Sequence, residues 1–176
     1  MKFAVGFQLY EGNEEPFSHI VNTYKAHISE VFFAWQDIPT GRSSVATRHG
    51  YTDWTAQQRM EEELRAIKAM GIKLDLLFNG NCYGEYAISE KLANLVISVI
   101  EHLGQAVGGV EIITTASPFI AHTVKKHFPD IEVRASVNMK IGTVKGMEYL
   151  ADLFDSFHVQ REYNRDFAHL KMLKGW

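Results

Sequence analysis

Short runs rich in β-branched and aromatic residues alternate with longer amphipathic runs along the whole chain, and this alternation strongly constrains the fold. Six short runs read as strands, and each is followed by a run with helical spacing of its apolar residues. The predicted strands are 3–9, 30–35, 72–78, 110–115, 131–137 and 157–161. The predicted helices are about 16–27, 55–70, 89–103, 118–127, 143–154 and 165–176. Strict strand-then-helix order predicts a parallel sheet with helices outside it.

Two architectures are compatible with this order, an open doubly wound sheet and a (β/α) barrel. An eight-unit barrel typically needs about 250 residues, so six units in 176 residues fall short of one. The central strands of a doubly wound sheet should be apolar on both faces. Here the fifth strand places Arg134, Ser136 and Asn138 opposite Val133 and Ala135. This polar face favours a barrel with a polar interior, although charges at strand ends in water would give a similar pattern.

We therefore predict an α/β protein with a parallel (β/α) barrel of the TIM type, incomplete with six βα units and forming one domain over residues 1–176. Lys and Arg number 18 against 21 Asp and Glu, a net charge of −3 that does not indicate a nucleic-acid surface. A single cysteine, Cys82, excludes an internal disulfide. The sequence shows neither a signal peptide nor an apolar run of about 20 residues that could span a membrane, so we expect a cytoplasmic location.

The segment from Val133 to Asn164 resembles the collagenase-like peptidase family, numbered thirty-two among peptidases of unassigned catalytic type. That family shows a Ser-x-Asn at the end of a strand, then a helix with a Tyr-Leu-like pair, then a strand that ends in Arg-Glu. In this sequence the corresponding residues are Ser136 and Asn138, Tyr149 and Leu150, and Arg161 and Glu162. The specific match covers about 30 of the 176 residues.

The resemblance implies a barrel-like fold and a cytosolic, enzyme-like protein. Members of the family include candidate proteases and proteins needed for hydroxylating RNA bases and ubiquinone precursors, and several hold an iron–sulfur cluster through cysteines. The cluster-binding cysteines and two further βα units lie beyond the reach of this chain, so the cofactor is unknown. A gene fragment, a shortened relative and a chain that completes its sheet with a partner all remain open.

Glu162 is the first candidate for a catalytic residue. It follows the sixth predicted strand on the face shared with Gln160, and the family's Arg-Glu maps onto Arg161 and Glu162. A carboxylate in a concave mouth can serve as a general acid or base. The alternative is a salt bridge with Arg134 or Lys140 that orders the rim, and alternation within a strand would point Arg161 the other way.

Amide and hydroxyl side chains at the strand ends are candidates for binding a polar ligand. Ser136 and Asn138 end the fifth strand, and the loop after the third strand carries Asn79 and Asn81. These groups could equally satisfy one another inside a polar barrel. Cys82 lies in the same loop, but no histidine is adjacent in sequence to activate it.

The long loop from Ile38 to Trp54 adds Arg42 and Arg48, which lie among aromatic residues and could clamp an anionic or planar group. The alternative is a surface loop whose aromatics pack on the rim. No metal site is readable, because neither an HExxH motif nor a facial-triad spacing occurs. Neither GxGxxG nor GxxxxGK[ST] occurs.

Two functional hypotheses follow. The first is an enzyme, hydrolase-like or hydroxylation-related by resemblance, that binds a small polar or peptide-like ligand at the carboxyl ends of its strands. The second is a non-catalytic subunit or fragment that completes its sheet by oligomerising, because a six-stranded open sheet leaves two strand edges unpaired.

Overall fold

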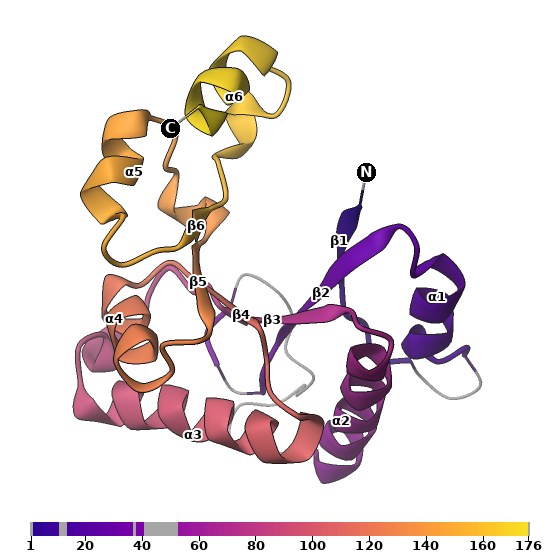
Figure 1. Cartoon of the computed structure of the whole chain (residues 1–176). Coiled ribbons are helices and arrows are strands. Elements are labelled where there is room, and N and C mark those ends of the chain that lie inside the picture. Colours follow the sequence, from indigo (N-terminus) through magenta and orange to yellow (C-terminus); the bar gives the residue numbers. More distant parts are fainter. Residues whose placement is uncertain (1, 11–13, 37, 41–52, 176) are drawn as a thin grey trace.

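The computed structural model describes residues 2–10, 14–36, 38–40 and 53–175, and it contains one sheet of six parallel strands in sequential order. The strands are β1 (Phe3–Gly6), β2 (Ile28–Ala34), β3 (Lys73–Phe78), β4 (Ile112–Thr115), β5 (Glu132–Ala135) and β6 (Ser156–Phe157). Figure 1 shows how the sheet curls, so that the six strands form a half-barrel. The alternation of strand and helix and the parallel sheet predicted from the sequence are confirmed.

The helices follow the strands as the sequence indicated, with small differences at their ends. They are α1 (Phe17–Tyr24), α2 (Trp54–Ala69), α3 (Glu90–Val107), α4 (Pro118–His127), α5 (Val144–Leu150) and α6 (Phe167–Lys174). Helices α1 to α4 pack each against the next, on one side of the sheet (Figure 1). Within the described residues, no helix is both long and apolar enough to cross a membrane.

The convex face of the sheet carries the apolar core. Register pairs Val31 with Leu74, Phe33 with Leu76, and Ile113 with Val133, and all of these side chains are buried beneath the helices. The alternating pattern of the fifth predicted strand placed Val133 on this apolar face. The intervening residues point to the concave face, where the polar groups of β3 and β5 gather.

Capping side chains position most of the helices. Asp53 accepts a hydrogen bond from the Ala56 N–H at 3.0 Å at the start of α2, and Ser89 accepts from the Leu92 N–H at 3.2 Å at the start of α3. Helix α1 begins after Pro16, which cannot supply such a cap. Instead the buried carboxylate of Glu63, on α2, accepts from the Ser18 N–H at 2.6 Å.

The last βα unit departs from the sequence prediction. Strand β5 ends at Ala135 and is followed by the 3₁₀ turn η2 (Val137–Met139), and β6 has only two residues instead of a run to Arg161. Arg161 and Glu162 lie in a second 3₁₀ turn, η3 (Arg161–Tyr163). The pairing of β6 with β5 ends where Phe157 lies opposite Ala135, the last residue of β5.

Candidate functional site

The carboxyl ends of β3 and β5 are joined by side-chain hydrogen bonds. The Asn138 amide nitrogen donates to the Asn79 carbonyl oxygen at 2.8 Å, and the Asn79 side-chain oxygen accepts from the Thr40 hydroxyl at 2.7 Å. The Ser136 hydroxyl accepts from the Asn138 N–H at 3.2 Å and begins the turn η2. The sequence-predicted residues Asn79, Ser136 and Asn138 therefore lie together, and part of their hydrogen-bonding capacity is used internally.

These residues surround a pocket on the concave face, which we call the inner pocket. Its volume is about 190 Å³. Its lining consists of Ala4, Phe32, Asp75, Leu77, Asn79, Thr114, Ser136, Val137, Asn138, His158 and Arg161. The pocket lies at the strand ends where (β/α) barrels place their chemistry.

Asp75 is the most unusual group in the inner pocket. Its side chain is 1% exposed, and its Oδ2 atom accepts a hydrogen bond from the Thr114 hydroxyl at 2.8 Å. Its Oδ1 atom has no hydrogen-bond partner among the described residues. Burial raises the pKa of Asp75 to about 7, outweighing the opposing effects of Thr114 and of Arg134. The carboxyl group therefore changes its charge near neutral pH.

A network centred on Arg134 lies beside Asp75. The guanidinium Nη1 is 2.6 Å from Glu30 Oε1 and 3.8 Å from Asp75 Oδ2, and Nη2 is 2.9 Å from Glu132 Oε1. The Ser156 hydroxyl donates to Glu132 Oε1 at 2.6 Å. The guanidinium thus forms ion pairs with two glutamates inside the half-barrel, which partly compensates their burial away from bulk water.

His158 adds a second titratable group to the lining of the inner pocket. It follows β6, and its N–H donates to the Ala135 carbonyl at 2.9 Å. Partial desolvation and the positive charge of Arg134 lower the pKa of its imidazole below the usual value. The neutral form of the ring is therefore favoured.

A second pocket of about 260 Å³, the outer pocket, lies beside the inner pocket, and we call the two together the mouth. Asn138 and Arg161 line both pockets, so the two are contiguous. Val137 also lines both pockets, and the outer pocket is completed by Asn81, Lys140, Gln160 and Glu162. Lys140 ends the turn η2 in a left-handed conformation, with φ of 53°. Such conformations are uncommon for side chains other than glycine and often lie at functional sites.

Glu162 lies in the outer pocket, exposed, on a 3₁₀ turn rather than at a strand end. The strict alternation expected for Arg161 and Glu162 does not hold there, because a 3₁₀ turn does not alternate its side chains, and both residues line the outer pocket. The predicted salt-bridge partner Arg134 is instead bound to Glu30 and Glu132. Arg42 and Arg48 fall outside the described residues.

The loop after β3 is fixed by close packing. A side chain at Gly80 would meet the Pro39 carbonyl oxygen at 2.6 Å, so glycine allows the two segments to approach. The Tyr83 hydroxyl donates to the Phe78 carbonyl at 2.7 Å. Cys82 is exposed, and its sulfur accepts from the Gly84 N–H at 3.3 Å. The described residues contain no group of three His, Cys, Asp or Glu side chains suited to a metal ion.

Sequence reasoning did not single out Asp75, Thr114 or His158 as site residues. Asp75 carried a readable signal, since it is a lone carboxylate within the apolar run Lys73–Phe78. Thr114 had only its place at a strand end, and His158 only its place on the polar face of an alternating strand. Their role depends on the register that places them beside other strands.

The fold and this polar mouth define a barrel-like α/β protein. A solved structure described as the U32 peptidase Mk0906 superposes with a TM-score of 0.72 at 14% sequence identity, covering 99% of this chain and 65% of that chain. This similarity shows a U32-like fold, and the chain spans 65% of the length of that protein. A candidate dehydratase from Mesorhizobium loti gives a TM-score of 0.46 at 13% identity, covering 86% of this chain and 38% of the other. No family model and no curated protein matches the sequence.

Proposed function

We propose that the chain is a peptidase-like enzyme of the TIM-barrel type that binds a small polar or peptide-like ligand in the mouth formed by the inner and outer pockets. The observation that carries the proposal is the continuity of the two pockets through Asn138 and Arg161 at the carboxyl ends of the strands. The U32-like fold supports a hydrolytic reaction.

Glu162 is the proposed catalytic residue. Its carboxylate lines the outer pocket near Lys140 and Arg161, and it is open to water. A carboxylate in this position can take a proton from an attacking water molecule. Asn79, Asn81, Ser136 and Asn138 supply hydrogen bonds that orient a polar ligand, and Arg161 supplies a positive charge.

The test is hydrolysis of a defined mixture of short peptides, followed by mass spectrometry, with Glu162→Gln and with Glu101→Gln as the matched control on the exposed side of α3. We expect Glu162→Gln to lower the hydrolysis rate at least tenfold with an unchanged thermal midpoint, as in general acid–base catalysis. Glu101→Gln should behave as the unsubstituted chain. Full activity in Glu162→Gln, or no hydrolysis by the unsubstituted chain, would reject the catalytic proposal.

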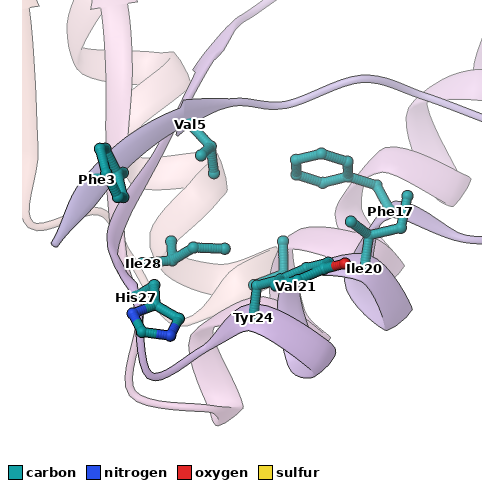
Figure 2. A pocket seen from close by; sticks show the side chains of 8 residues that line it. All are labelled: Phe3, Val5, Phe17, Ile20, Val21, Tyr24, His27 and Ile28. Atoms are coloured by element: carbon teal, nitrogen blue, oxygen red, sulfur yellow. The ribbon is translucent and has the colours of Figure 1, made fainter.

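A second candidate function is that of a subunit whose sheet is completed by a second copy of the chain. Within the described residues, β1 pairs with β2 alone and β6 pairs with β5 alone, so each has an open edge. Beside the β1 edge lies an apolar groove of about 390 Å³ between β1 and α1. Figure 2 shows Phe3 and Val5 of β1 facing Val21 and Tyr24 of α1 across it.

The other end of the sheet also carries exposed apolar side chains, among them Phe167 and Met172 on α6, which are 74% and 52% exposed. Two half-barrels related by a twofold axis would bring each β6 end to the other's β1 edge and cover both surfaces. Light scattering during size-exclusion chromatography tests this: 40 kDa is expected for the pair and 20 kDa contradicts it. Ile20→Glu in the groove should dissociate the pair, whereas Ile88→Glu, at an exposed position outside the groove, should not.

A further inference from the structure

The inner pocket holds a buried polar atom that has no hydrogen-bond partner among the described residues. Asp75 Oδ1 is buried and has no hydrogen-bond partner among the described residues, whereas Oδ2 is occupied by the Thr114 hydroxyl. Leaving a buried polar atom unpaired costs free energy, and native proteins rarely tolerate it without a reason. Because Asp75 lines the inner pocket, an occupant of that pocket is the natural source of the missing partner.

The surroundings of the pocket specify what that occupant must offer. The amide side chains of Asn79 and Asn138 and the hydroxyl of Ser136 are hydrogen-bonding groups suited to a planar polar unit, and Leu77 and Phe32 add apolar walls. Arg161 is exposed and lines both pockets, so it lies where the ligand enters. An arginine in such a position favours a carboxylate.

We propose that the inner pocket binds the carboxyl-terminal unit of a peptide-like ligand, with the ligand's carboxylate at Arg161 and its amide carbonyl accepting a hydrogen bond from the protonated Oδ1 of Asp75. This proposal rests on the proposed function of the same mouth and names its ligand class. A pocket of about 190 Å³ admits an acylated amino-acid unit. Asp75 acts here as a binding residue that reads the ligand's amide, with Thr114 fixing its orientation.

The proposal has a pH dependence with a definite sign. In its neutral form Asp75 carries a proton that can be donated to the amide carbonyl, and its pKa of about 7 means that the proton is lost above neutral pH. The charged groups around it are Glu30 on β2 and Glu132 and Arg134 on β5. His158 also lines the pocket. Amide recognition should therefore weaken between pH 6 and pH 8.5.

The experiment measures binding of N-acetylglycine and of butyrate to the whole chain by protein-observed NMR titration. Both probes carry a carboxylate, but only N-acetylglycine carries an amide. We expect N-acetylglycine to bind at least tenfold more tightly at pH 6. Asp75→Leu should remove that preference and leave butyrate binding unchanged, and Arg161→Gln should weaken both probes.

Asp75→Asn provides a second test that does not depend on the folding of Asp75→Leu. The asparagine amide keeps a donor at every pH, so the preference for N-acetylglycine should become independent of pH between 6 and 8.5. Equal affinities for the two probes in the unsubstituted chain, or no binding of either, would overturn the proposal. An unchanged pH profile in Asp75→Asn would also overturn it. The catalytic proposal is tested by peptide hydrolysis in Glu162→Gln, and the ligand proposal is tested by probe binding. The failure of one can therefore be told apart from the failure of the other.

Discussion

Phe32 and Phe33 are neighbours on β2, yet they lie on opposite faces of the sheet and meet different surroundings. Phe33 is 2% exposed and belongs to the core beneath the helices. Phe32 is half-buried and lines the inner pocket. The same difference holds over the whole described sheet. Apolar side chains fill the convex face, whereas the concave face holds Asp75, Arg134 and their partners. The apolar packing of the convex face therefore stabilises the fold, and the concave face carries polar groups that the stability of the fold does not require.

The largest expected effect comes from Phe33→Ala. Removing a fully buried aromatic ring loses its transfer free energy and leaves a cavity, and we expect about 4 kcal/mol of destabilisation. Phe32→Ala is the matched control one residue away, and it should cost about half as much because its ring borders a pocket. Urea denaturation followed by circular dichroism measures both. Equal losses would show that the two faces are packed alike.

Arg134→Met is expected to destabilise the chain by about 3 kcal/mol. The substitution leaves Glu30 and Glu132 without their guanidinium partner in a partly buried site, and uncompensated charges of this kind are costly. Lys125→Met breaks the exposed pair with Asp155 and should cost less than about 1 kcal/mol. Urea denaturation measures the free energy of unfolding of both variants. Equal losses would contradict the prediction, because the Arg134 network would then contribute no more than an exposed ion pair.

The stability difference between Asp75→Asn and the unsubstituted chain should change with pH. Asp75 titrates at 3.8 unfolded and at about 7 when folded, so the folded chain binds the extra proton between these values. The stability supplied by neutral Asp75 is complete below about pH 4 and is lost as the pH rises to about 7. The asparagine variant should therefore gain stability relative to the unsubstituted chain by about 3 kcal/mol between pH 4.5 and pH 7.5. Thermal midpoints at pH 4.5 and pH 7.5 measure it, and a constant difference would contradict the raised pKa.

The smallest expected effect is that of Lys140→Gly. Lys140 has a φ of 53°, and glycine adopts this conformation without the strain that a side chain brings. We expect stabilisation of about 0.5 kcal/mol after the entropic cost of glycine. Lys145→Gly, within α5, should instead destabilise by about 1 kcal/mol. Destabilisation by both substitutions in urea would show that the turn at the outer pocket is unstrained.

The sequence predicted the convex face more fully than the mouth. Alternating apolar residues such as Val133 and Ala135 define a face by period alone, and the capping residues Ser89 and Asp53 mark helix starts locally. The mouth depends on which strands become neighbours: Thr114 meets Asp75 only because β3 and β4 pair in one register. The short β6 and the turn that carries Glu162 were missed, because the alternation of apolar and polar residues from Phe157 to Arg161 looks like a strand whether or not a neighbour pairs with it.

The first turn of helix α1 has no side-chain cap from its own segment, because Pro16 precedes it. Its first turn is held by Glu63, which lies 45 residues further along the chain on α2. During synthesis the N-terminal βα unit therefore emerges before the group that fixes it, and its closure carries the entropy of a long loop. Helix α1, which leaves the ribosome before α2, is thus expected to reach its final position only after α2 has formed.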